Sequence, residues 1–214
     1  MGTNIFKKIL VIYLVFLCVF SSDNSYSNEK FKVKGDTLYY DSDLAKQEID
    51  QEITFLDVGE FKRVLSENKI KTVVLNSQGG IIEAAFEAAD LMIDFDVDTH
   101  ISGLCFSACY WLFLAGNKRT MERGSKLGFH QSYFLPEDIE TYYNENKKSE
   151  GWNSMYEYAS ILYEETQNEI YKDFEYQLER GVTPRFIMQT IKVPSDQEFF
   201  PRRKILLDAG VLTQ

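Results

Sequence analysis

A buried strand that ends in a glycine pair and leads directly into a helix is the feature that most limits how this chain can fold. The run IKTVVLNSQGG, residues 70–80, is typical of a strand that is covered on both faces of a parallel sheet. After it, apolar residues recur at helical spacing, at Ile82, Phe86, Ala89 and Ile93. A second strand-and-helix unit follows over residues 97–117. Because parallel strands need such crossovers, the pattern predicts an α/β fold.

The rest of the chain fits one domain over residues 28–214. An N-terminal strand pair turns at Gly35, and the helix that follows has Asp57 as its expected N-cap. A polar and aromatic segment over about 137–190 has helical periodicity and is interpreted as a helical insertion. The tail predicts a short closing helix from about Pro201.

Residues 1–27 have the layout of a secretory signal peptide. Lys7 and Lys8 precede an apolar run over 9–20, and small polar residues follow, which places the expected mature start near Asn28. The run is short for a transmembrane helix, which needs about 20 apolar residues, although a retained membrane anchor is the alternative. We therefore expect a periplasmic or secreted protein that does not bind the membrane after cleavage.

The net charge of −10 argues against a nucleic-acid partner, because phosphate binding needs clustered Lys and Arg. A metal site is disfavoured as well, since the mature chain has only two cysteines and His100 and His130 as its histidines. No cofactor is expected. In an oxidising compartment Cys105 and Cys109 are expected to form a disulfide. Reduced core cysteines are the first alternative, and a thiol-disulfide redox pair is the second.

Three polar or glycine positions follow the predicted strands: the pair Gly79 and Gly80, then Ser107, then His130. The carboxyl ends of parallel strands share one edge of a sheet, so these residues can meet there. Imidazole is suited to taking the proton of a serine nucleophile near neutral pH. Backbone N–H groups at the glycine pair and at Ala108 can stabilise the oxyanion that forms.

Each of these residues also has a structural interpretation. Ser107 is a possible N-cap of the apolar helix, and the glycine pair is a possible tight turn. His130 fits a polar residue satisfied at a sheet edge. The same interpretation is preferred for His100, which is left out of the site.

The combined blocks VVLNSQGG, ISGLCFSACYWLFLAGNKR and GSKLGFHQS resemble the Clp-type serine proteases of the Clp/crotonase superfamily. That family has a strand ending in N-S-P-G-G, a nucleophilic serine opening a helix that ends in Ala-Gly, and a strand ending in His-Gln. The resemblance covers residues 70–133 well and 195–212 weakly. The Cys-x-Ser-Ala-Cys form is similar to secreted, poorly characterised members. The resemblance implies a Clp/crotonase-like fold of repeated β-β-α units around a parallel sheet.

By this resemblance Ser107 matches the nucleophile and His130 the base, while Gly80 and Ala108 match the oxyanion-hole amides. The third triad member lies before the closing helix, where Asp196 is the preferred match. Glu198 is the alternative to Asp196 as the third triad member. Gln78 stands where the family has proline, which leaves the geometry of the oxyanion loop open. The segment 137–190 has no close counterpart in the family and is either a lid over the crevice or an interface.

The expected function is a secreted or periplasmic serine peptidase that acts through a Ser107 acyl-enzyme without an ATP-driven partner. Its substrates are expected to be peptides or unfolded proteins, and the resemblance implies a homo-oligomer. A non-catalytic binding or assembly module on the same fold is the alternative, because one fold can support many functions.

Overall fold

The computed structural model describes residues 29–47 and 51–214, so the predicted signal segment 1–27 lies outside the described residues. The elements in chain order are β1 (Phe31–Lys34), β2 (Thr37–Asp41), the 3₁₀ helix η1 (Ser42–Leu44), α1 (Phe55–Glu67), β3 (Thr72–Ser77), α2 (Ile82–Asp94), β4 (Asp98–Phe106), α3 (Cys109–Leu114), β5 (Arg119–Met121), β6 (Lys126–Gly128), α4 (Pro136–Asn146), α5 (Met155–Glu179), α6 (Pro184–Thr190) and α7 (Arg203–Asp208).

The sheet is mostly parallel, which confirms the predicted α/β class. Its strand order is β1-β2-β3-β4-β5, and β6 pairs with the second half of β4. The antiparallel β1–β2 hairpin turns at Gly35, as expected, whereas β2, β3, β4, β5 and β6 pair in parallel. β3 and β4 therefore lie in the middle. The predicted burial of β3 on both faces is observed only in part, because its alternate residues are fully buried and those between them are partly exposed. This arrangement brings the ends of β3, β4 and β6 to one edge.

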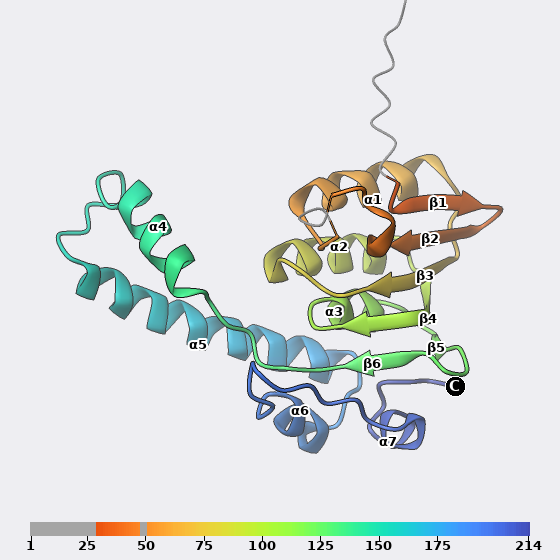
Figure 1. The fold of residues 1–214 in the computed structure, drawn as a ribbon. Coiled ribbons are helices and arrows are strands. Elements are labelled where there is room, and N and C mark those ends of the chain that lie inside the picture. The colour runs from red at the N-terminus through yellow and green to blue at the C-terminus, as the bar shows by residue number, and fades with distance from the viewer. Residues whose placement is uncertain (1–28, 48–50) are drawn as a thin grey trace, which may run out of the picture.

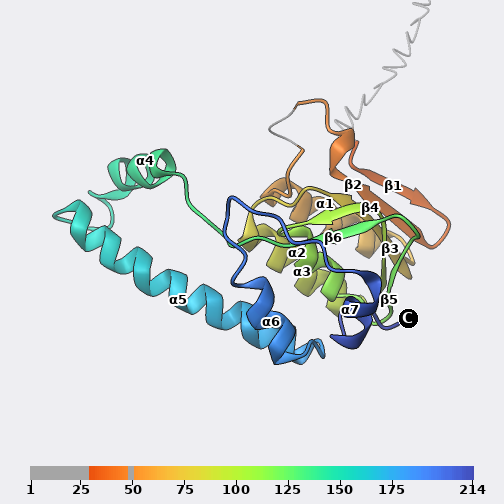
Figure 2. The same cartoon turned by 60° about the horizontal axis from the view of Figure 1, so that its bottom comes forward.

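Helices α1, α2 and α3 lie side by side along one face of the sheet (Figures 1 and 2). Small residues on α2 let it pack closely between its neighbours, because Ala84, Ala85, Ala88 and Ala89 are all fully buried. Helix α3 is apolar nearly all round and is buried at five of its six residues. The core between these helices and the sheet therefore holds β3, β4 and α3 rigidly, and with them the turns at their ends.

The predicted helical insertion consists of α4, α5 and α6. Helix α4 and the first half of α5 extend away from the body as an arm, and the second half of α5 returns against it (Figures 1 and 2). Tyr142, Tyr143, Trp152 and Tyr158 stack where α4 and α5 meet. Within the described residues no helix is both long and apolar enough to cross a membrane.

A buried ion pair supports the start of α1. Lys30 Nζ lies 2.6 Å from the carboxylate of Asp57, and both side chains are almost completely buried. The prediction that Asp57 is the N-cap of α1 is wrong, because the N-cap is Thr54. Asp57 instead accepts a hydrogen bond from the Thr54 N–H at 2.8 Å, so its carboxylate reaches back from the first turn. The Tyr40 hydroxyl donates to the same carboxylate at 3.3 Å.

Replacing Tyr40 with phenylalanine is expected to lower the free energy of unfolding by about 1 kcal/mol, because the buried carboxylate of Asp57 loses one of its donors. The ring stays, so its packing against Phe31 and Phe61 is preserved. Urea denaturation measures the change. Tyr39→Phe is the matched control, because the side chain of Tyr39, the residue next to Tyr40, is partly exposed. Equal stability of the two variants would contradict the prediction.

Candidate active site

The strand register brings three of the predicted site positions together. Ser77 at the end of β3 pairs with Cys105 of β4, and Phe106 of β4 pairs with Gly128 of β6. All three strands run in parallel. Ser107 therefore follows the end of the central strand, with the glycine pair on one side and His130 on the other, as the sequence predicted from strand order.

Ser107 has a backbone conformation that is uncommon for a residue with a side chain. Its φ is +53°, in the left-handed region, and its N–H donates to the Gly128 carbonyl at 3.1 Å. Such strained residues are concentrated at functional sites. The alternative that Ser107 is the N-cap of α3 is not supported, because the N-cap is Ala108 and no side chain caps that helix. The serine side chain is thus presented at a sharp strand-to-helix turn.

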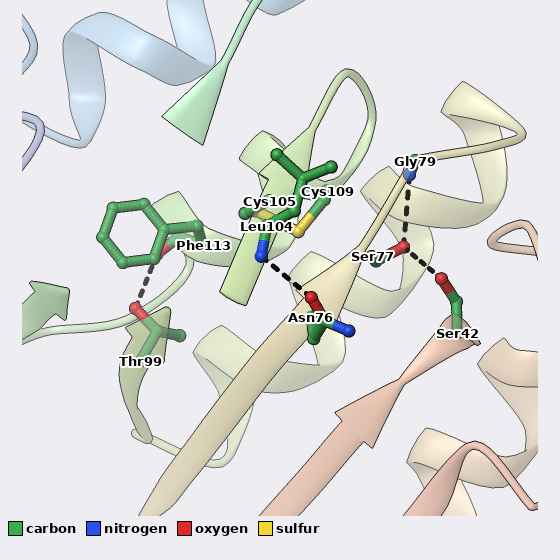
Figure 3. Close-up of a disulfide and its surroundings, with 9 residues drawn as sticks. All are labelled: Ser42, Asn76, Ser77, Gly79, Thr99, Leu104, Cys105, Cys109 and Phe113. Carbon is green, nitrogen blue, oxygen red and sulfur yellow. Dashed lines mark hydrogen bonds between the residues drawn. A yellow bond between two sulfur atoms is a disulfide. The ribbon is translucent and has the colours of Figure 1, made fainter. Parts of the chain in front are cut away.

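A disulfide joins Cys105 and Cys109, so the predicted bond is present (Figure 3). Their Cα atoms are 5.3 Å apart, and both side chains are completely buried. Cys105 belongs to β4 and Cys109 is the first residue of α3. The bond therefore closes the turn that carries Ser107. Complete burial also argues against the alternative of an exchange-active redox pair.

The glycine pair packs against the serine turn. A Cβ on Gly79 would lie 2.8 Å from the Phe106 carbonyl oxygen and 2.8 Å from the Ser107 Cβ, so only glycine fits there. A Cβ on Gly80 would collide with the backbone of Ile53 instead. Among the described residues the N–H groups of Gly80 and Ala108 donate to no protein acceptor. Neither residue is part of the cavity lining and Ala108 is completely buried, so their role as oxyanion donors stays a prediction.

His130 follows β6 and is half-buried. Its ring stacks on Phe106, with centroids 4.9 Å apart, and lies near the ring of Tyr133. Its Nδ1 is buried and has no hydrogen-bond partner among the residues that the structure describes. In the described part of the chain no hydrogen bond joins His130 to Ser107, although both side chains line one cavity. The nucleophile and the base of the predicted pair thus line one cavity without a hydrogen bond between them.

The two candidate acids lie on an exposed loop close to His130. Gln131 donates from its backbone N–H to the Val193 carbonyl at 2.8 Å, and Phe129 pairs with Phe199 in an antiparallel bridge. The loop between these two anchors contains Asp196 and Glu198, both exposed. Neither carboxylate is bonded to the imidazole in this structure. The choice between the two acids stays a prediction.

A cavity of about 290 Å³ opens beside Ser107 and His130. One wall comes from the returning half of α5, through Thr166, Glu169, Ile170, Asp173 and Gln177. The other walls come from Ile82, Tyr110, Trp111, Phe129, Gln131, Ser132, Thr190 and Ile191. The helical insertion therefore covers part of the crevice, which supports the lid alternative for this half of α5. The exposed surface of the lining is mainly apolar, although nine of its fifteen residues have polar or charged side chains.

Two carboxylates of α5 face this cavity. Burial raises the pKa of Asp173, although the Trp111 indole N–H and the Gln177 amide donate to the carboxylate at 2.6 and 3.0 Å. Burial also raises the pKa of Glu169, and the nearby negative charges of Glu83 and Asp173 add to the effect. A raised carboxyl pKa means that the fold binds the proton more tightly than the unfolded chain does. Ionisation of these groups therefore costs stability.

Replacing Asp173 with asparagine is expected to stabilise the protein increasingly as the pH rises from about 4, the ordinary pKa of aspartate. In the wild type, ionisation of the buried carboxylate lowers stability as pH rises toward the raised pKa of the folded state, and asparagine does not ionise. Urea denaturation across pH 4–7 measures the difference. Asp138→Asn, on an exposed part of α4, controls for net charge. A difference that shrinks with rising pH would contradict the prediction.

The cavity wall that α5 contributes was not predicted from the sequence. Glu169, Asp173 and Gln177 recur four residues apart, which is the spacing of one helical face, so a periodicity signal existed. This spacing did not show which surface the helical face would cover.

His100, left out of the predicted site, bonds to Thr120 through Nδ1 at 2.7 Å and is absent from the cavity lining. No group of three or more metal-ligating side chains occurs in residues 29–47 and 51–214.

Three comparisons with known proteins were informative to different degrees, and the family model is the one that identifies the family. A comparison with curated protein sequences finds no match. Among solved structures, an asparagine-to-aspartate mutant of ClpP1 from Listeria monocytogenes is similar, with 20% identity and a TM-score of 0.47 over 77% of this chain and 90% of that chain. The Clp protease family model matches residues 41–180, the segment that contains the glycine pair, Ser107 and His130. Because this match spans well over half of the sequence, the chain belongs to the Clp protease family.

Proposed function

We propose that this protein is a secreted or periplasmic serine peptidase that hydrolyses peptide bonds through an acyl-enzyme on Ser107. The observation that carries the proposal is the serine turn itself. Ser107 has a left-handed backbone, is closed in by the Cys105–Cys109 disulfide and lies at a cavity shared with His130. Membership in the Clp protease family supports the same chemistry.

In the proposed reaction Ser107 Oγ attacks the carbonyl carbon of the substrate while His130 accepts the hydroxyl proton. The oxyanion of the tetrahedral intermediate accepts hydrogen bonds from the N–H groups of Gly80 and Ala108. The C–N bond then breaks, and His130 returns the proton to the leaving amine. Water, deprotonated by His130, hydrolyses the ester and releases Ser107 with its proton restored. A carboxylate from residues 194–198, preferably Asp196, orients the imidazole.

The proposed compartment limits the substrates. ATP is not expected outside the cytoplasm, so no ATP-driven unfoldase would deliver folded proteins. Peptides and already unfolded chains are therefore the proposed substrates, and membership in the family supports a homo-oligomer.

Cleavage of the proposed signal peptide has its own test. Intact mass of protein recovered from the periplasm or medium is expected to correspond to a start near Asn28, and recovery only as full-length, membrane-bound protein would contradict it.

A non-catalytic binding module on the same fold is the second candidate. The absence of a Ser107–His130 hydrogen bond and the unpartnered Nδ1 of His130, both within the described residues, favour it. Catalytic hydrogen bonds are often long before substrate binds, so the geometry is compatible with both candidates. Reactivity of the serine distinguishes them.

The deciding experiment is labelling of the mature protein with a fluorophosphonate probe, followed by intact mass and peptide mapping. The wild type is expected to take one adduct, on Ser107, and Ser107→Ala none. Ser102→Ala is the matched control, because Ser102 lies on β4 and bonds to Glu122 away from the cavity. An unlabelled wild type, or equal labelling of Ser107→Ala, would overturn the proposal in favour of the binding module.

Removing the disulfide by Cys105→Ser with Cys109→Ser is expected to slow this labelling by about a hundredfold, because a nucleophile displaced by about 1 Å loses that much rate. The closed loop is short, so the effect on global stability is expected to be modest. Stopped-flow labelling and urea denaturation separate the two effects. Titration of unfolded, unreduced wild type is expected to find no free thiol from this pair. Undiminished labelling of the double variant would refute a positioning role for the disulfide.

A further inference from the structure

The loop between β3 and α2 is held by hydrogen bonds on both sides. The Ile53 N–H donates to the Gly79 carbonyl at 2.7 Å, and the Ile81 N–H donates to the Ile53 carbonyl at 2.9 Å. On the inner side, the Gly79 N–H donates to the Ser77 hydroxyl oxygen at 3.2 Å (Figure 3). The two peptide groups that flank Gly79 are therefore each fixed by one bond.

The bond to Ile53 determines where the Gly80 N–H points. In a planar trans peptide the N–H and the C=O point in opposite directions, so the Gly80 N–H faces away from the Ile53 amide that binds the Gly79 carbonyl. Gly79 itself lies against Ser107 and the Ala108 nitrogen. The orientation of the Gly80 amide relative to the serine turn thus depends on how the Gly79 backbone is held.

Ser77 holds that backbone from inside the protein. Its side chain is completely buried at the end of β3, and its oxygen also accepts a hydrogen bond from the Ser42 hydroxyl at 3.0 Å (Figure 3). Ser42 is likewise completely buried, in η1. With glycine at both 79 and 80, the backbone has few steric restraints of its own. The hydroxyl of Ser77 therefore supplies a restraint that the glycine pair lacks.

The geometry points to Ser77, supported by Ser42, as a positioning residue that aims the Gly80 N–H at the oxyanion of the reaction. This inference rests on the proposed peptidase function and assigns a role to a side chain that does not line the cavity. An amide held in advance stabilises the transition state without reorganisation during the reaction, whereas it contributes little to binding of the uncharged ground state. Loss of the restraint should therefore lower the rate of acylation and leave affinity unchanged.

The test compares Ser77→Ala with Thr99→Val. Thr99 is a matched control, because its hydroxyl is also buried and donates to a backbone carbonyl, that of Phe113, at 2.7 Å (Figure 3). With a fluorophosphonate probe, Ser77→Ala is expected to lower the limiting labelling rate by about tenfold, less than the roughly hundredfold or greater effect of deleting an oxyanion donor. The probe concentration at half-maximal rate is expected to stay unchanged, and Thr99→Val is expected to keep the wild-type rate.

A second readout follows the loop independently of activity. Hydrogen exchange is expected to become faster at the amide of Gly79 in Ser77→Ala and to stay unchanged there in Thr99→Val. Faster exchange with a wild-type labelling rate, or equal rate losses in both variants, would overturn the positioning role alone. A wild type that takes no adduct on Ser107 would overturn the proposed function and this role together.

Discussion

Replacing His130 with glutamine is expected to slow acylation of Ser107 by about 10²- to 10⁴-fold, the usual contribution of a general base. Glutamine keeps polar atoms near the position of the imidazole, but it cannot accept the serine proton at neutral pH. The stack on Phe106 is lost with the ring. The measurement is the rate of fluorophosphonate labelling together with hydrolysis of an unstructured peptide.

His100→Gln is the matched control for that experiment. His100 lies on β4 and is bonded to Thr120, outside the cavity. It is expected to retain labelling within about twofold, in line with the small effects of most substitutions away from special features. Equal rate losses in the two variants would show that the His130 effect is not specific, and a wild-type rate in His130→Gln would remove His130 from the mechanism.

Replacing Asp196 with asparagine is expected to lower peptide hydrolysis by about 10³-fold or more, because the imidazole loses the carboxylate that orients it and stabilises its charged form. Within the described residues His130 Nδ1 is buried and has no hydrogen-bond partner, so the carboxylate that would accept from it is a prediction. The exposed loop between Val193 and Phe199 is anchored to residues 129 and 131, on either side of His130, and carries Asp196. Folding should be little affected, because Asp196 is exposed.

Glu198→Gln tests the alternative acid on the same loop. A loss of about 10³-fold in Glu198→Gln, with Asp196→Asn unchanged, would transfer the role to Glu198. Wild-type rates in both variants would refute a carboxylate from this loop as the third member. Labelling and hydrolysis are measured on the same preparations, with urea denaturation to confirm that each variant is folded.

Prediction from sequence worked best where local pattern and chain order act together. The apolar run in residues 70–80 and the short segment 97–104 predicted strands, and β3 and β4 occupy these places in the middle of the sheet. Parallel strands place their carboxyl ends at one edge, so the neighbourhood of the glycine pair, Ser107 and His130 followed from strand order. The cysteine spacing and the expected compartment predicted the disulfide that is present.

Prediction was weaker where one local sequence fits two conformations and contacts between distant residues determine which of them forms. An aspartate at the start of a helix can be the N-cap or can lie in the first turn, and Asp57 lies in the first turn of α1. Its carboxylate is buried beside Lys30, a contact that the local sequence does not indicate. The interpretation of Ser107 as a cap failed because β4–β6 pairing and the disulfide place the serine before the helix begins. Neither contact can be deduced from neighbouring residues.

By itself, the sequence determined the parallel α/β sheet, its alternating strand-and-helix units and the order in which the glycine pair, Ser107 and His130 reach one edge. Hydrophobic periodicity and crossover geometry are local properties that require no knowledge of distant contacts. Only the tertiary structure decided that the returning half of α5 walls the cavity and that Ser77 holds the glycine loop. Those outcomes depend on how rigid elements dock and on which hydroxyls become buried, and such contacts join residues far apart in the chain.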